Sequence, residues 1–81
     1  MCEVHLAGSL RDAVGGAATV DIDANTVAAL LRKLVERYPL MREKIDEGIA
    51  VSIGGEIYRD NWSKTIPQGV EVYLLPRIPG G

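Results

Sequence analysis

The chain has 81 residues, which is enough for one small domain built around a single core. Apolar residues make up 47% of it and charged residues 25%, with a formal net charge of -2, and this balance excludes a disordered chain. The nine basic residues form no stripe of the kind that nucleic-acid-binding domains carry. No apolar run approaches the ~18 residues that cross a membrane. We therefore expect no nucleic acid and no membrane among its partners.

A single cysteine, Cys2, rules out an internal disulfide. No basic-then-apolar signal peptide opens the chain, and the two observations together favour the reducing cytoplasm. One cysteine and one histidine cannot build the usual zinc sites, and an iron–sulfur cluster needs four thiolates. The phosphate-binding glycine motifs are also missing. We expect the chain to bind no metal and no cofactor by itself.

The first part of the chain reads as a hairpin. Residues Cys2–Leu6 and Thr19–Asp23 alternate apolar and polar side chains, which is the pattern of half-buried strands. Between them, Ser9–Val14 is predicted to form a short helical turn with Ser9 as its N-cap. We expect the two strands to pair antiparallel. Cys2 and His5 would then lie on opposite faces of the first strand, so Cys2 is expected to fill the core and His5 to lie on the solvated surface.

The strongest pattern follows at residues 27–38. Thr26 can cap a helix there, because its hydroxyl can accept a bond from a free backbone N–H. Behind it, apolar residues recur at the three- and four-residue spacing of one helix face, and Pro39 ends the pattern. A shorter helical piece is predicted over Leu40–Glu47.

Three more strands are predicted in the second half. Ile49–Ile53 reads as a buried strand, Glu56–Tyr58 as its return after a glycine turn, and Val70–Leu75 as the last strand. The stretch Arg59–Ile66 has no regular pattern, and its Trp62 is expected to cover one end of the core.

Two strands, a helix and further strands are typical of an α+β domain with one main helix packed on one face of a mixed sheet. The apolar face of the helix can pack on a sheet only if the first and last strands are neighbours at the centre of that sheet. This is the β-grasp (ubiquitin-like) arrangement. A ferredoxin-like layout needs a second full helix, and residues 40–47 are too few for one. We expect four to five strands, a domain over residues 1–75 and an extended tail over residues 76–81.

Alternate residues of the last strand point to opposite faces, so Leu74 is expected to face the helix while Tyr73 and Leu75 face away. Tyr73 and Leu75 would then leave apolar surface beside the root of the tail, where a partner could bind, and Ile78 would extend it. The alternative is a second small cluster within the domain, together with Trp62.

The tail itself has the chemistry of an activatable carboxylate. Pro76 and Pro79 lack backbone donors, so the segment resists helix and further sheet pairing and should project as an extended arm. Gly80 and Gly81 have no side chains and could thread a narrow channel in an enzyme that activates the terminal carboxylate, for example as an acyl-adenylate. If sulfur then replaces an oxygen, the thiocarboxylate is a good nucleophile, as a thiolate is.

These features resemble the MoaD/ThiS family of ubiquitin-like sulfur carriers across essentially the whole chain. The resemblance rests on four segments: the loop Leu10–Gly15, the helix start Thr26–Leu31, the turn Val51–Glu56, and Gly69–Pro76 followed by the terminal Gly80-Gly81. The first of these segments is closest to the MoaD branch, the small subunit of molybdopterin synthase.

The resemblance implies that the chain is not an enzyme but a protein substrate or small subunit that acts with enzymes. An activating enzyme would use ATP to adenylate Gly81, which becomes a thiocarboxylate, and a synthase would accept the sulfur, most simply the large subunit of molybdopterin synthase. Ile78, Pro79 and Gly80 would thread into these partners. The residues Tyr73, Leu75, Pro76 and Arg77 would form the interface.

Other functions share the same tail. A carrier for thiamin thiazole or cysteine biosynthesis would donate its sulfur to a thiazole synthase or a cysteine-synthase-like enzyme. A ubiquitin-like modifier would be joined to protein lysines, and a non-catalytic β-grasp binding module would carry the two glycines incidentally.

Overall fold

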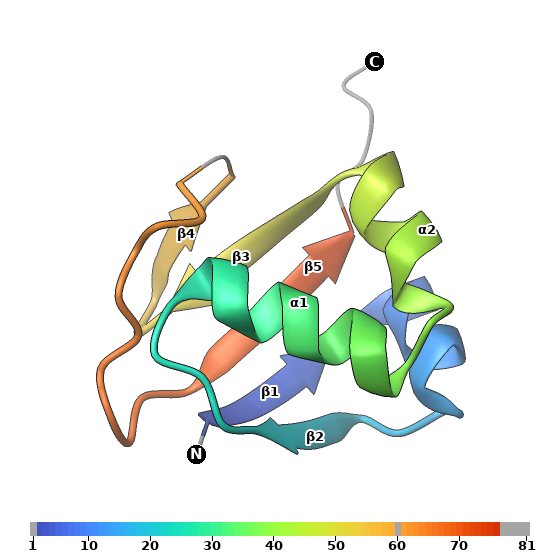
Figure 1. Cartoon of the computed structure of the whole chain (residues 1–81), viewed down its shortest axis with the longest axis horizontal. Coiled ribbons are helices and arrows are strands. Elements are labelled where there is room, and N and C mark those ends of the chain that lie inside the picture. The colour runs from blue at the N-terminus through green and yellow to red at the C-terminus, as the bar shows by residue number, and fades with distance from the viewer. Residues whose placement is uncertain (1, 60, 77–81) are drawn as a thin grey trace.

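The computed structural model describes residues 2–59 and 61–76. In this part of the chain, five strands form one mixed sheet in the order β2-β1-β5-β3-β4. Helix α1 crosses one face of the sheet, while α2 and a 3-10 helix, η1, stack at one end (Figure 1). In chain order the elements are β1 (Cys2–Leu6), η1 (Gly8–Val14), β2 (Thr19–Ile22), α1 (Val27–Arg37), α2 (Met41–Glu47), β3 (Ile49–Ile53), β4 (Glu56–Tyr58) and β5 (Val72–Pro76).

The pairing of the two ends of the chain confirms the β-grasp prediction. β1 lies parallel to β5 at the centre of the sheet, with Val4 opposite Val72 and Leu6 opposite Leu74. β2 pairs antiparallel with the outer side of β1, and β3 pairs antiparallel with both β5 and β4. The described residues therefore form one layer of helix over one layer of sheet, and none of their helices covers the far face of the sheet (Figure 1).

The core fills the space between α1 and the sheet. Helix α1 presents Val27, Leu30 and Leu34 to the sheet, and all three side chains are fully buried, as the predicted stripe requires. Val35 and Tyr38, at the end of that stripe, are only half-buried and pack on the edge of the core. From the sheet, the fully buried residues are Val4, Ile49, Val51, Val72 and Leu74.

The loop after β4, for which the sequence showed no regular pattern, supports the first turn of α1. The first N–H groups of a helix have no partners within the helix. Here the carbonyl of Lys64 accepts from the N–H of Val27 at 3.1 Å, and the carbonyl of Trp62 accepts from that of Ala28 at 2.7 Å. The Thr26 hydroxyl accepts from the next N–H, as predicted for an N-cap. Trp62 packs against the edge of the core, as expected, and it does so because its backbone is bonded to the helix.

Two local predictions were wrong. Ser9 is not an N-cap, because η1 already begins at Gly8, its N-cap is Ala7, and no side chain caps it. The last strand runs over Val72–Pro76 rather than over residues 70–75, so Pro76 belongs to the sheet and not to the tail. Pro76 lies opposite Ile49 at the last position of β5, a strand end where a missing backbone donor is tolerated.

Replacing Leu34 by Ala should lower the free energy of unfolding by about 2–5 kcal/mol, because the change leaves a cavity between α1 and the sheet. Leu40→Ala is the matched control: Leu40 is 63% exposed, so its truncation should change stability by no more than about 0.5 kcal/mol. Urea unfolding of both variants measures the difference. Equal midpoints for the two would contradict the described core.

Candidate functional site

The face of the sheet that α1 leaves uncovered, here called the open face, carries one continuous row of side chains. The strand registers place Thr19, His5, Tyr73, Ser52 and Ile57 side by side across all five strands. Directly paired residues share a face of a sheet. Tyr73 is 40% exposed and Ile57 is 56% exposed, so apolar surface reaches solvent here as the sequence predicted for Tyr73.

An aromatic pair lies at the centre of this row. The rings of His5 and Tyr73 stack with their centroids 4.4 Å apart and their planes 15° from parallel. His5 was expected on the solvated surface; instead it is half-buried, because the tyrosine of the parallel neighbour covers it. Its Nε2 atom makes no hydrogen bond of good geometry within the described residues, although Oε1 of Glu3 lies 2.9 Å away.

Carboxylates surround this pair. Oε2 of Glu71 lies 3.8 Å from Nε2 of His5 and accepts a hydrogen bond of 2.9 Å from the Tyr73 hydroxyl. That hydrogen bond, together with the negative charges of Glu71 and Glu3, raises the pKa of Tyr73 above its ordinary value. The open face is therefore apolar along its central row and negatively charged beside it, which suits a partner surface with apolar and basic groups.

We expect the variant Glu71→Gln to lower the pKa of Tyr73, because an amide neither repels the phenolate nor accepts as strong a bond. Ultraviolet absorbance during an alkaline titration follows the three tyrosines together. The variant Tyr73→Phe identifies which of the titration steps belongs to Tyr73. An unchanged step for Tyr73 in Glu71→Gln would contradict the described hydrogen bond.

The open face continues to the root of the tail. Leu75 is half-buried and lies opposite Ala50, a buried residue outside the main core cluster, so these two side chains cover each other on the open face. Pro76, next to them, is exposed. Tyr73 and Leu75 therefore face away from the helix, as the alternation predicted, and Pro76 ends the same strand beside them. Their role as a partner interface stays a prediction. The alternative, a second cluster that includes Trp62, is not formed among the described residues, because Trp62 packs on the helix side.

The remaining predicted site residues, Arg77, Ile78, Pro79, Gly80 and Gly81, lie outside the described residues. The contributions of His5 and Ile57 to the open face were missed. Alternation assigns each residue to a face of its own strand, whereas the neighbours across the sheet depend on registers that one strand does not reveal.

Comparison with known proteins connects this geometry to a family. The ThiS family matches residues 4–81, which is nearly the whole chain, and no curated protein sequence matches it. Among solved structures, SAMP1 from Haloferax volcanii is 28% identical, with 99% of this chain and 98% of that chain covered and a TM-score of 0.75. None of the helices in residues 2–59 and 61–76 has the length and apolar character needed to span a membrane.

Two further structures share the fold and were solved with partner proteins. In the BexX/CysO complex from Amycolatopsis orientalis, the similar chain is 21% identical, with both chains covered completely and a TM-score of 0.80. In the complex of subunits 1 and 2 of the molybdopterin-converting factor from Helicobacter pylori, identity is 22%, coverage 99% and 97%, and the TM-score 0.70. By its fold and its match over residues 4–81, the chain belongs to the ThiS family, whose members are small sulfur carrier proteins that act with partner enzymes and are not catalysts themselves.

Proposed function

We propose that this chain carries sulfur on the carboxylate of Gly81. A partner enzyme would use ATP to adenylate that carboxylate, with release of pyrophosphate. A sulfur donor would then displace AMP to leave a thiocarboxylate, which passes its sulfur to an acceptor in cofactor or metabolite biosynthesis. The observation that carries the proposal is the family match, which extends to residue 81 and so includes the two terminal glycines.

The geometry of β5 supports this proposal. Tyr73 and Leu75 lie on the open face, and the same strand ends at Pro76, five residues before the terminal carboxylate. A partner bound to the open face could therefore reach both Leu75 and the tail. In this arrangement Tyr73, Leu75, Pro76 and Arg77 form the interface, and Ile78, Pro79 and Gly80 lead Gly81 into the active site.

The first candidate for the pathway is molybdopterin synthesis, with the large subunit of molybdopterin synthase as the acceptor of sulfur. Its support is the likeness of the segment Leu10–Gly15 to the MoaD branch. A thiazole synthase or a cysteine-synthase-like enzyme would be the acceptor in the related pathways. Cys2 is buried and free, which agrees with the reducing cytoplasm that we propose as the location.

A second candidate function is covalent attachment to protein lysines. The 28% identity with SAMP1, extending over 99% of the chain, favours it, because a relative of that type is named as a small archaeal modifier protein. Both functions begin with the same activation of Gly81, and they differ in whether sulfur or a lysine amine then displaces the activating group.

Intact-mass spectrometry tests the proposal directly. The chain is co-expressed with the activating enzyme of its own organism and a sulfur donor, and the expected species is heavier by the difference between one sulfur and one oxygen atom. The increment must map to the C-terminal peptide, because oxidation of either methionine gives nearly the same mass. Higher-mass conjugates joined through Gly81 would instead support the modifier function. An unmodified carboxylate with every activating enzyme of that organism would overturn both.

A further inference from the structure

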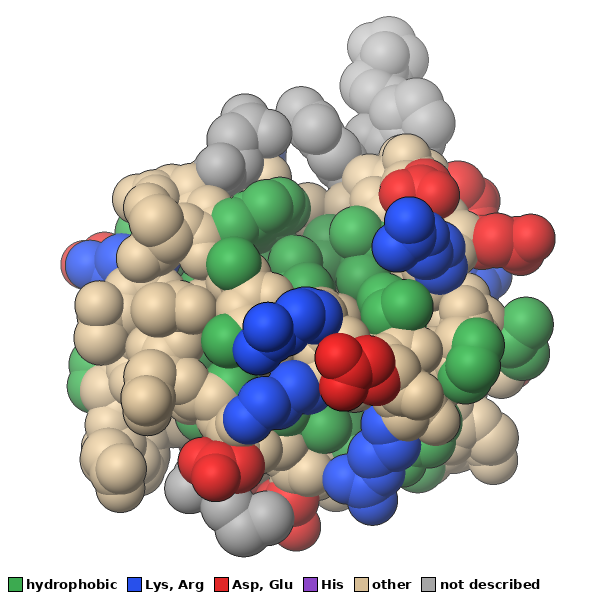
Figure 2. All heavy atoms as spheres, viewed as in Figure 1, with side chains coloured by type: hydrophobic (Ala, Val, Ile, Leu, Met, Phe, Trp, Pro, Cys, Tyr) green, Lys and Arg blue, Asp and Glu red, His purple; other side chains and the backbone are tan. Residues whose placement is uncertain are grey.

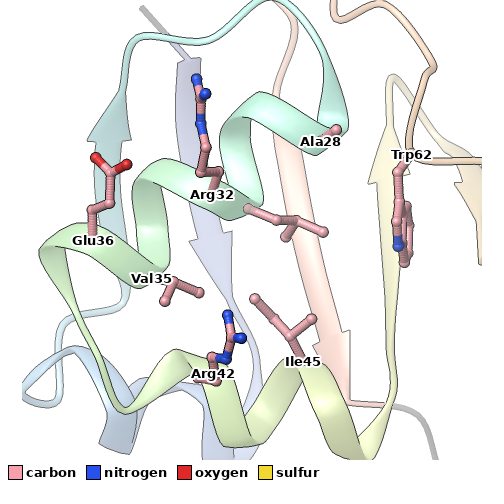
Figure 3. Close-up of a pocket in the computed structure, with 8 residues that line it drawn as sticks. Ala28, Arg32, Val35, Glu36, Arg42, Ile45 and Trp62 are labelled. Atoms are coloured by element: carbon pink, nitrogen blue, oxygen red, sulfur yellow. The ribbon is translucent and has the colours of Figure 1, made fainter.

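A groove lies on the helix side of the molecule, opposite the open face and separate from the proposed interface. It runs between α1, α2 and the loop that holds Trp62, and its volume is about 450 Å³. Figure 2 shows apolar side chains gathered in a hollow there, and Figure 3 shows Val35 and Ile45 approaching from the two helices, with Trp62 across from them. A mostly apolar hollow of roughly 300–1,000 Å³ is typical of binding sites.

The groove also has a positive charge available for an anion. Arg42 projects from α2 into the space between the helices, and Arg32 and Glu36 lie on the rim that α1 forms (Figure 3). The described residues form two ion pairs, and His5 takes part in each of them. No carboxylate of the described residues therefore pairs with the guanidinium of Arg42. An apolar groove with one unpaired arginine fits an apolar segment that ends in a carboxylate.

The last five residues of this sequence are an apolar segment that ends in a carboxylate. They are Arg77, Ile78, Pro79, Gly80 and Gly81, so two apolar residues are followed by two small ones and a terminal carboxylate. Five extended residues can reach about 17 Å.

These last five residues follow a strand that ends beside the groove. Pro76 lies opposite Ile49, which follows α2 after a single glycine, and Ile45 in the last turn of α2 lines the groove. The segment that leaves Pro76 therefore starts next to the helix that forms one wall.

We propose that the groove binds the chain's own C-terminal segment when no partner enzyme holds it. Ile78 and Pro79 lie over Ile45 and Trp62, and the carboxylate of Gly81 pairs with Arg42. Three acidic residues of α2 that line one hollow, Glu43, Asp46 and Glu47, are then available to Arg77. A segment tethered this closely has an effective concentration on the order of millimolar, so weak contacts are enough to hold it.

This inference rests on the proposed function, and it adds a step that controls access of the activating enzyme to the carboxylate of Gly81. An activating enzyme must take the tail from the groove before it can adenylate Gly81. If the groove holds the tail half of the time, the apparent affinity of the enzyme is lowered about twofold. A variant that empties the groove would lower KM by that factor and leave kcat unchanged.

Nuclear Overhauser effects in the full-length protein test the proposal without any enzyme, so the result is independent of whether sulfur is ever loaded. We expect contacts between the methyl groups of Ile78 and the indole ring of Trp62, which is the only tryptophan in the chain. Arg42→Gln should remove them. The matched control is Arg37→Gln, because Arg37 lies on α1 outside the groove and donates to the Asp21 carbonyl.

Three results would overturn the proposal. The first is the absence of contacts between Ile78 and Trp62 in the wild-type chain. The second is contacts that survive Arg42→Gln, since the carboxylate would then have no role. The third is contacts that appear only between differently labelled copies in a mixed sample, because a second molecule would then supply the tail. Contacts within one chain that are lost in Arg42→Gln and kept in Arg37→Gln would establish it.

Discussion

Deleting Gly81 should abolish formation of the heavier, sulfur-loaded species. The carboxylate of Gly80 would then stop about 3.5 Å short of the reaction centre of the activating enzyme. Misplacement of a reacting atom by even 1 Å can lower a rate by about 100-fold. Intact-mass spectrometry after co-expression with the activating enzyme measures the loss, and the shortened chain should be as stable as the wild type because the deletion lies beyond β5.

An added residue after Gly81 provides the matched control for chain length. It keeps every native residue, yet it should block loading equally, because a side chain enters the narrow channel and the carboxylate moves off the two glycines. Sulfur loading of either variant at the wild-type level would show that the terminal position of Gly81 is not what the enzyme recognises.

Leu75→Asp should weaken binding of the activating enzyme by at least about 2 kcal/mol, which is roughly a 30-fold loss of affinity. The substitution puts a charge into the apolar surface beside the tail and adds to the negative charge of Glu71 on the same face. Affinity can be measured by calorimetry with the purified enzyme.

The control for this variant is Leu40→Asp, which places the same charge on an exposed residue far along the chain from β5. Both variants should unfold cooperatively, since neither residue is in the main core cluster. Wild-type affinity for Leu75→Asp, with its fold intact, would remove the open face from the proposed interface.

Much of this fold could be predicted because local pattern and packing agree. The apolar spacing of α1, the Thr26 cap and the alternation in β1 each indicate one structure, and the buried residues match them. The start of η1 could not be predicted, since Gly8 adopts a φ of +56° that no side-chain pattern announces. The end of β5 was predicted one residue too early. A proline usually marks the end of sheet pairing, but it is tolerated at the last position of a strand, where Pro76 lies.

Parts of the candidate site required spatial information. The stacking of His5 on Tyr73 depends on the register between the first and last strands, and the position of Trp62 depends on bonds between its backbone and α1. Neither follows from the spacing of residues within one segment. The terminal glycines lie outside the described residues, so their role in carrying sulfur stays a prediction from the sequence.

The parallel pairing of β1 with β5 makes the sheet depend on two segments that are far apart in the sequence. The central strand, β5, follows the other described strands in the sequence, so a growing chain that has not reached Val72 lacks the partner of β1 and β3. Contacts between residues so far apart in sequence also make folding slow relative to a helical bundle. A chain that stops before Val72 would therefore lack both the complete sheet and the part of the open face around Tyr73, so a partner that binds this face would not recognise it.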